Sequence, residues 1–291
     1  MTGVVHLTPL DPAYPARLRT LAQPPSTLSL RGGPVQAERV VAVVGSRAAH
    51  PDTMDLAREL AARLARAGAV VASGGAVGID ASAHLGALDA GGRTWAVAPT
   101  GCNRCFPPSH GALFERIGRG PGAMLWPFAP DAQYRSGFAT RNQVLVALSD
   151  AVVVVQAGAR SGALHAATCA GKLGRPLWVV PAPPWRQGGF EGTHALVERI
   201  GRAPHPIRPL TSLERFVAEM GLDAAPVLSR VRSGSEAAVF DATSTVPLHL
   251  DEIAVRSHCA AGTVSAVLLT LALEDVVVED PPGYFRRRDG V

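Results

Sequence analysis

The stretch Val70-Val71-Ala72-Ser73-Gly74-Gly75-Ala76-Val77-Gly78-Ile79-Asp80-Ala81-Ser82-Ala83-His84 decides the fold of this 291-residue chain. An apolar β-branched run leads through a glycine-rich turn into an alanine-rich segment, which predicts a strand, a turn and a helix in succession. Glycines let a backbone approach a ligand closely, and the free amides at a helix start favour anionic groups. Two interpretations of Gly74, Gly75 and Gly78 stay open: a phosphate-binding turn, or only a tight strand-to-helix connection.

On both sides of this stretch, apolar runs alternate with helix-like segments. We expect six strands, at Val40–Val44, Val70–Ala72, Thr94–Ala98, Ala123–Trp126, Ala151–Val155 and Pro176–Val180. We expect helices near residues 53–67, 80–90, 109–118, 139–148, 162–172 and 192–200. Continuous apolar strands that alternate with helices indicate a sheet covered on both faces. The prediction is an α/β fold with a Rossmann-like, doubly wound, mainly parallel sheet.

Polar, glycine-bearing loops follow four of these strands, at the edge where open sheets bind ligands. They include Gly45-Ser46-Arg47 after the first strand and Ala157–Gly162 after the fifth. Arg47 offers phosphate a two-pronged donor and Ser46 a hydroxyl; binding is favoured for Arg47, with an exposed surface charge as the alternative. The first loop has one glycine where a dinucleotide fingerprint needs three, and the chain has no Walker-type Gly-Lys-Ser/Thr. These absences argue against NAD chemistry and nucleotide hydrolysis.

Other polar residues have both a binding and a structural interpretation. Arg141 and Asn142 either face the same cleft or form a polar pair at a helix start, and Lys172 either binds phosphate or complements a helix end. His84 lies one helical turn after Asp80, which favours a structural hydrogen bond over a catalytic dyad, because no nucleophile accompanies the pair.

Composition excludes several classes of protein. The chain is 47% hydrophobic and has no apolar run near the roughly 20 residues that span a membrane. Its start lacks the basic and apolar regions of a signal peptide, so we expect a cytoplasmic protein with no membrane partner. Cys102 and Cys105 have no second Cys/His pair at zinc-site spacing. We expect reduced thiols, no metal and no cofactor.

Charge is distributed unevenly along the chain. Residues 41–200 carry 15 Lys/Arg and 10 Asp/Glu, whereas residues 247–291 carry 4 and 7. An anionic partner is therefore expected at the central domain rather than at the tail.

The tail has its own pattern. A proline-rich linker starts at Arg202, a short helix is expected at Ser212–Met220, and residues 223–245 lack strong periodicity. Two helices, Leu248–His258 and Thr263–Leu273, and a hairpin of Val276–Glu279 and Tyr284–Arg287 then resemble a winged helix. The second helix has no basic residue, so we favour a protein-contact role over groove binding, with Arg286-Arg287-Arg288 as the possible phosphate contact. The predicted parts are a lead-in (1–40), a Rossmann-like domain (41–201), a linker (202–245) and a winged-helix-like domain (246–291).

Six motifs in order carry a family resemblance. They are Gly45-Ser46-Arg47, then Ser73-Gly74 with Gly78-Ile79-Asp80 and Ala83-His84, then Phe106-Pro107, Phe138 with Arg141-Asn142, Ser161-Gly162, and Gly174-Arg175 with Val180-Pro181. This order resembles the DNA-processing protein A family (DprA, also called Smf), in a divergent form without the family's helical N-terminal domain.

The resemblance implies a non-catalytic protein that binds and protects single-stranded DNA. Family members typically form dimers and help to load the RecA recombinase in natural transformation, so RecA and a second copy of the chain are the implied protein partners. By position, the DNA or phosphate pocket would contain Gly45, Ser46, Arg47, Gly74, Gly75, Gly78, Arg141, Asn142, Ser161, Gly162 and Lys172. Phe106 is the base-stacking candidate, with core packing as its alternative, and Asp80 and His84 are assigned structural roles.

This chain departs from the family pattern at several positions. Val77 and Gln143 stand where arginines are usual, Phe106 replaces a tyrosine, and Gln156 replaces a glutamate at the end of the fifth strand. His110 and His194 replace asparagines. Two fewer arginines should weaken phosphate neutralisation and flatten the salt dependence of binding.

An alternative function is a nucleotide-binding protein or a phosphoribohydrolase that acts on nucleoside monophosphates. Such enzymes resemble Pro-Gly-Gly-x-Gly-Thr-x-x-Glu after the matching strand, where this chain has Ala157-Gly158-Ala159-Arg160-Ser161-Gly162-Ala163-Leu164-His165. The catalytic glutamate is missing, so the binding protein is preferred over the enzyme.

Overall fold

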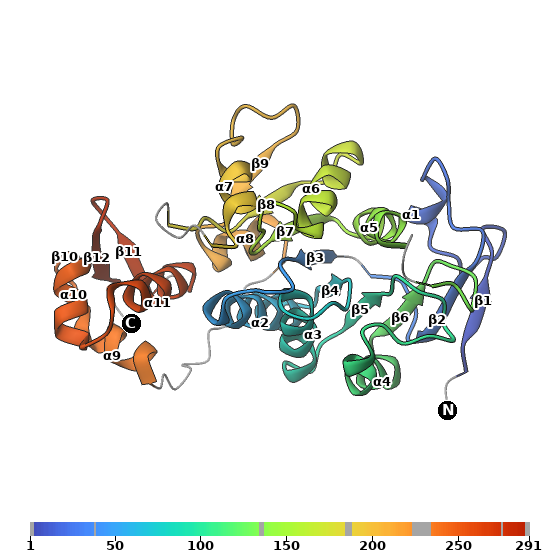
Figure 1. Ribbon diagram of the computed structural model, residues 1–291, viewed down its shortest axis with the longest axis horizontal. Helices are drawn as coiled ribbons and strands as arrows, with labels where there is room; N and C mark the ends of the chain where they lie inside the picture. Colours follow the sequence, from blue (N-terminus) through green and yellow to red (C-terminus); the bar gives the residue numbers. More distant parts are fainter. Residues whose placement is uncertain are drawn as a thin grey trace. The chain divides into compact units, whose positions relative to one another are not determined.

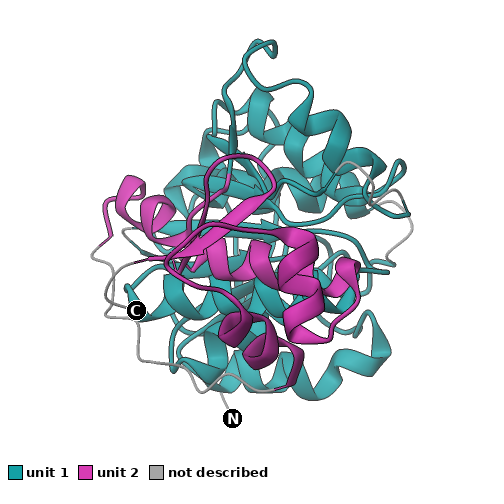
Figure 2. Cartoon of the chain, turned by 90° about the vertical axis from the view of Figure 1, so that its left-hand side faces the viewer, with its two compact units in different colours: residues 1–209 teal, residues 210–291 magenta. Residues whose placement is uncertain are grey.

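The six predicted apolar runs all form parallel strands of one sheet. They are β3 (Val40–Val44), β4 (Val70–Ser73), β5 (Thr94–Val97), β6 (Ala123–Trp126), β7 (Ala151–Val154) and β8 (Leu177–Val179). The computed structural model describes residues 3–37, 39–133, 137–183, 188–222, 234–274 and 276–288. The chain divides into two units, residues 1–209 and 210–291 (Figure 2).

The strand order locates the binding edge. It runs β1-β2-β6-β5-β4-β3-β7-β8-β9. From β3 the chain first builds outward through β4, β5 and β6, and it then returns to β7 on the other side of β3. The order therefore reverses between β3 and β7, which is where ligands bind in open α/β sheets.

Helices cover both faces of the sheet (Figure 1). One face carries α2 (Pro51–Arg66), α3 (Ile79–Asp89) and α4 (Gly111–Arg119), with the short 3-10 turn η1 (Pro108–His110) before α4. The other carries α1 (Ala16–Arg19), α5 (Gly137–Leu148), α6 (Gly162–Lys172) and α7 (Glu191–Val197). Each face of the sheet has its own hydrophobic core, and alternate residues of a strand belong to different cores because their side chains point to opposite faces. Val97 and Leu125 belong to the core on the α5 side. Ala96, Met124 and Trp126 pack beside Phe114 in the other core. The predicted α/β, mainly parallel architecture is confirmed.

The sheet extends beyond the six predicted strands. β1 (Val5–Leu7) and β2 (Leu28–Gly32) lie in the expected lead-in, yet β2 pairs antiparallel with β6 and β1 with β2. β9 (Ile207–Pro209), in the expected linker, runs parallel to β8 at the sheet edge, where a proline is tolerated. Each of these strands contains polar residues or a proline (Val-His-Leu, Leu-Ser-Leu-Arg-Gly and Ile-Arg-Pro), so none shows a continuous apolar run.

The second unit contains the expected winged helix. Its elements are α8 (Leu213–Glu219), α9 (Gly234–Ala242), β10 (Leu248–His249), α10 (Leu250–Ser257), α11 (Ala261–Leu273), β11 (Val277–Glu279) and β12 (Tyr284–Arg287). Leu248 and His249 were expected to begin a helix, but they form a strand paired with β12. α9 lies in the expected linker, and its Val239 is part of the core formed by Ile253, Val264 and Leu268.

One expected phosphate contact in this unit has a structural role. The Arg287 guanidinium lies 4.0 Å from the centre of the Phe240 ring and donates hydrogen bonds to the carbonyl oxygens of Phe240 (2.6 Å) and Thr243 (3.0 Å). It ties the hairpin to α9.

Among the described residues, no single helix is long and apolar enough to cross a membrane. Only α10 and α11 together reach that length, and their axes are bent by 106° to each other.

Candidate functional site

A cavity of about 580 Å³ opens at the switch point between β3 and β7. The loops after β3, β4 and β7 and the start of α5 line it. Its lining residues are Val44, Gly45, Ser46, Arg47, Ala48, Ala76, Asp80, Phe138, Arg141, Asn142, Gly158, Arg160, Ser161, Gly162, Ala163 and Ala166. Seven of the predicted binding residues therefore lie in one cavity: Gly45, Ser46, Arg47, Arg141, Asn142, Ser161 and Gly162.

Two arginines share one aromatic ring in this cavity. The Arg47 guanidinium carbon lies 4.7 Å from the centre of the Phe138 ring, and that of Arg141 lies 5.9 Å from it. Phe138 and Arg141 are three positions apart on α5 and so lie on the same side of the helix. The Phe138 ring attracts both guanidinium groups and so offsets the repulsion between their two positive charges. An anionic ligand would relieve that repulsion.

Arg141 is held from below by a buried carboxylate. Its Nη1 lies 3.9 Å from Asp80 Oδ2, and only 7% of each side chain is exposed. Burial raises the pKa of Asp80, and the Arg141 charge together with the Ala76 amide opposes that rise. Burial lowers the pKa of Arg141, but a guanidinium stays protonated at neutral pH. The Nε of Arg141 is buried and has no hydrogen-bond partner among the described residues.

In the glycine-rich turn, Ala76 lines the cavity, whereas the three glycines shape the packing beneath it. Gly74 is buried, and a Cβ there would overlap the Arg141 guanidinium. Gly78 has a φ of +80° and caps α3, and a Cβ there would meet the carbonyl oxygens of Ser46 and Arg47. Gly75 packs against Phe114 instead. This packing accounts for the three glycines as parts of a tight strand-to-helix connection, and their role in phosphate binding stays a prediction.

The start of α6 supplies the opposite wall. Ser161 caps this helix by accepting a hydrogen bond from the Ala163 amide (3.2 Å). Asn142 Nδ2 donates to the Gly162 carbonyl oxygen (3.2 Å), which fixes α5 against α6. Amides at a helix start favour anions. The exposed Arg160 stands beside them at the rim.

Two further predicted residues, Lys172 and Phe106, do not line the cavity. Lys172 is at the far end of α6, in a second groove with Arg199 and His205, because Gly162 and Lys172 are the first and last of the eleven residues of this helix. Phe106 is half-buried and meets the Phe138 ring edge-on at 6.2 Å, so it borders the site through Phe138. Its base-stacking role stays a prediction.

The expected hydrogen bond between Asp80 and His84 is wrong. Among the described contacts, Asp80 faces Arg141, and His84 Nδ1 lies 2.7 Å from Thr94 Oγ1. His84 is fully buried, and burial lowers its pKa to about 3. One helical turn of spacing placed the pair on neighbouring positions, but Arg141 on α5 pairs with Asp80, and Thr94 on β5 pairs with His84.

Sequence reasoning missed Phe138 and Arg160 as site residues. Phe138 had a usable signal, since it lies one turn before Arg141 on the same helix. The substituted positions Val77 and Gln143 are exposed, so neither is committed to the core. Gln156 is buried and bonds to the His50 amide and the Thr53 hydroxyl. Its side chain is therefore used by the fold. The four cysteines are free thiols, and no group of His, Cys, Asp or Glu among the described residues is arranged to hold a metal ion.

Comparison with known proteins gives the family. Residues 5–208 match the family described as DNA recombination-mediator protein A, and residues 223–283 match the DprA winged helix domain. A putative DNA processing protein DprA from Mycobacterium tuberculosis is 36% identical over 241 residues, covering 81% of this chain and 61% of that protein. The chain thus spans about three fifths of that relative's length.

Two solved structures share the fold. One is DNA processing protein A from Helicobacter pylori, described for its single-stranded DNA binding mode (TM-score 0.65, 27% identity, covering 75% of this chain and 95% of that one). The other is DprA from Streptococcus pneumoniae (TM-score 0.63, 30% identity, 70% of each chain). The family match covers the whole sheet and the cavity at its switch point, and this chain therefore belongs to the DNA recombination-mediator protein A (DprA/Smf) family.

Proposed function

We propose that this chain binds single-stranded DNA, without cutting it, in the cavity at the switch point. The observation that carries the proposal is the pair of guanidinium groups, Arg47 and Arg141, beside one phenylalanine ring. Guanidinium groups bind phosphates, and an aromatic ring beside them can stack on an unpaired base. The Helicobacter relative, described for binding single-stranded DNA, supports the same ligand.

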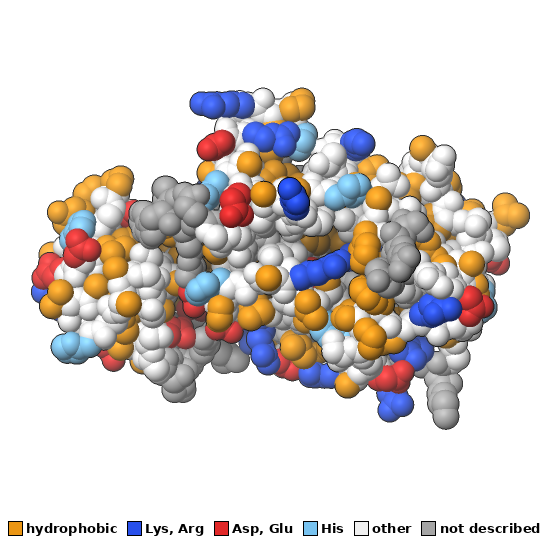
Figure 3. Space-filling model, viewed as in Figure 1, with side chains coloured by type: hydrophobic (Ala, Val, Ile, Leu, Met, Phe, Trp, Pro, Cys, Tyr) orange, Lys and Arg blue, Asp and Glu red, His pale blue; other side chains and the backbone are white. Residues whose placement is uncertain are grey.

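The positive charge of the large unit supports binding of an anionic polymer. Residues 1–209 carry 21 Lys/Arg and 12 Asp/Glu, a formal net charge of +9. Figure 3 shows basic side chains spread over the visible face of this unit, with hydrophobic ones between them. This combination suits strands whose backbone is charged and whose bases are exposed.

The carboxylate of the site supports binding over catalysis. Asp80 is the one acidic residue among the described lining residues, and its oxygen faces Arg141 in a buried pair. A general acid or base must instead reach the ligand. Base release from a nucleoside monophosphate would contradict this part of the proposal and favour the phosphoribohydrolase alternative.

The test is a titration of a labelled single strand and its duplex at about 50 and 200 mM salt. We expect the chain to prefer the single strand, and we expect Arg47→Ala to raise the Kd for the single strand about tenfold over that of the natural chain. The slope of log K against log salt should fall by about 0.7 for each phosphate that the variant no longer neutralises. Arg47 is the better target, because Arg141→Ala leaves Asp80 buried and unpaired, which costs about 3–5 kcal/mol of stability.

The matched control is Arg116→Ala, on the exposed surface of α4 and paired with Asp89. It removes the same charge away from the cavity, so binding should stay within twofold of the natural chain. Equal affinity for duplex, or equal effects of the two substitutions, would refute the assignment.

We further propose that the DNA-bound chain acts as a homodimer and helps to load the RecA recombinase, in natural transformation or another recombination pathway. The family description as a recombination mediator supports this role. Sedimentation of the chain with and without a bound oligonucleotide tests the dimer. RecA filament assembly on single strands, with the natural chain and with Arg47→Ala, tests the loading: the natural chain should accelerate assembly and the variant should not.

A further inference from the structure

Three elements that carry the cavity at one end converge at their other ends. β3 leads into Gly45–Arg47, β7 leads into the loop of Arg160 and Ser161, and α5 begins with Phe138 and Arg141. At the opposite edge of the sheet, β3 starts at Val40, α5 ends at Leu148 and β7 starts at Ala151. Asp150 lies between the last two.

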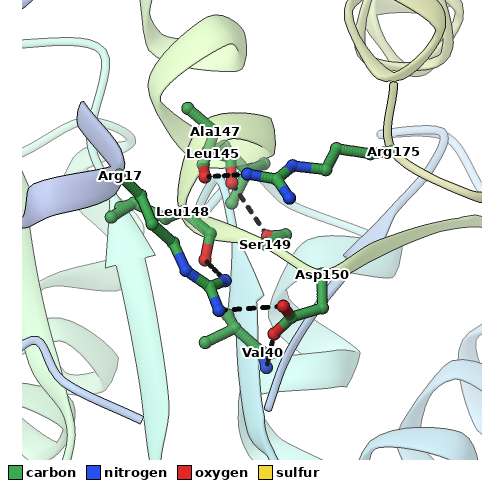
Figure 4. Close-up of polar contacts among 8 residues, drawn as sticks. All are labelled: Arg17, Val40, Leu145, Ala147, Leu148, Ser149, Asp150 and Arg175. Carbon is green, nitrogen blue, oxygen red and sulfur yellow. Dashed lines mark hydrogen bonds and ion pairs between the residues drawn. The ribbon is translucent and has the colours of Figure 1, made fainter. Parts of the chain in front are cut away.

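A set of contacts ties these far ends together, as Figure 4 shows. Asp150 Oδ2 accepts a hydrogen bond from the Val40 amide (2.8 Å), and Asp150 Oδ1 accepts one from Arg17 Nη2 (2.8 Å). Arg17 Nη1 donates to the Leu148 carbonyl oxygen (2.9 Å). We call Arg17, Val40, Leu148 and Asp150 the far-end clamp.

The clamp completes the C-terminal end of α5. The last carbonyls of a helix lack partners within it, and a cation there is favourable. Arg17 satisfies Leu148 from one side, and Arg175, which precedes β8, donates to the Ala147 carbonyl oxygen (3.2 Å) from the other (Figure 4). The helix end is therefore fixed by two arginines from distant parts of the chain.

The clamp is partly protected from water: 34% of the Arg17 side chain and 19% of the Asp150 side chain are exposed. α5 has twelve residues and is therefore about 18 Å long. A rigid helix transmits a tilt at its end to Phe138 and Arg141 at its start, and binding sites tolerate displacements of only about 0.5 Å.

We propose that Arg17 is a positioning residue for the DNA cavity, acting through the far-end clamp from the N-terminal segment. The inference rests on the proposed function. Arg17 touches no ligand and sets the alignment of α5 with β3 and β7.

The experiment compares Arg17→Gln with Arg19→Gln in the full chain. Both arginines belong to α1, but Arg19 donates to the carbonyl oxygens of Pro9 (2.9 Å) and Asp11 (2.6 Å) inside the N-terminal segment. The two variants lose the same charge. We expect Arg17→Gln to bind a labelled oligothymidine about threefold to tenfold more weakly than Arg19→Gln. The salt slope should not change, because Arg17 neutralises no phosphate.

Two further readouts separate positioning from stability. Amide hydrogen exchange at residues 141–145 should be faster in Arg17→Gln than in Arg19→Gln. Arg17→Lys should restore part of the affinity, since lysine keeps the charge but not the two-pronged geometry. Affinities of Arg17→Gln and Arg19→Gln within twofold of each other would overturn the proposal, even if Arg17→Gln melts at a lower temperature.

Hydrogen exchange tests the far-end clamp even when no DNA is bound. If the natural chain does not bind single strands, the proposed function fails, and hydrogen exchange alone decides the clamp. Unchanged exchange at residues 141–145 then overturns it, and faster exchange supports it.

Discussion

Gly74 lies directly against the Arg141 guanidinium, and a side chain at that position has no room. Its φ is not in the left-handed region, so alanine is excluded by the neighbour and not by the backbone. We expect Gly74→Ala to displace Arg141 from Asp80, with a loss of about 1–3 kcal/mol of stability from overpacking and about tenfold weaker DNA binding. Chemical unfolding and DNA titration measure the two effects. Gly111→Ala is the control, since open space surrounds that glycine; similar losses in both variants would contradict the packing argument.

His84 makes stability depend on pH. Burial, with smaller contributions from His110 and Arg141, lowers its pKa in the folded chain from 6.5 to about 3. Below pH 6.5 the His84 side chain binds a proton in the unfolded chain but stays neutral in the folded chain. The contribution of His84 to the free energy of unfolding is therefore fully present above pH 6.5 and is lost as the pH falls toward 3. Between pH 7.5 and 5 the natural chain should lose about 2 kcal/mol more of its unfolding free energy than His84→Gln. Equal losses in urea unfolding of the two proteins would show that His84 does not carry the effect.

At the scale of elements, the central strands were predictable because burial on both faces leaves a continuous apolar run, as in Val40–Val44 and Ala151–Val154. β1, β2 and β9 were not, since none has a continuous apolar run. β1 and β9 are the two edge strands, and β2 pairs with β6 through a long-range contact that the local sequence does not indicate. α6 was predicted with its observed bounds, Gly162–Lys172, but Lys172 was still assigned to the wrong site, because both ends of a helix cannot reach one cavity.

The candidate site was predictable where loops at one sheet edge converge, as with Arg47, Arg141 and Ser161. Pairing was harder. The choice of Arg141 over His84 as the partner of Asp80 depends on how α5 crosses above the turn, a long-range contact with no local signature. The same holds for Arg17, whose partners Leu148 and Asp150 are more than 130 positions away in sequence.

At the scale of the whole molecule, charge is divided between the units. Residues 210–291 carry 7 Lys/Arg and 12 Asp/Glu, a formal net charge of −5 against +9 for residues 1–209. The described part of α11 contains no basic residue, and Arg287 is occupied by Phe240 and Thr243. We therefore expect the winged helix to contribute little to binding a phosphate backbone and its negative charge to repel that backbone at low salt.

A chain shortened to residues 1–222 should for this reason bind single strands at least as tightly as the full chain. It keeps α8, whose Leu213 and Phe216 are buried, and removes 6 Lys/Arg and 10 Asp/Glu. We expect a gain of about twofold to fivefold at about 50 mM salt that disappears at about 200 mM, where the Debye length is about half as long and charges are screened over shorter distances. Circular dichroism and thermal melting of the shortened chain verify that it is folded before the titration. Binding more than tenfold tighter by the full chain would mean that the winged helix contacts DNA directly, and equal binding at both salt concentrations would mean that its negative charge lies too far from the cavity to matter.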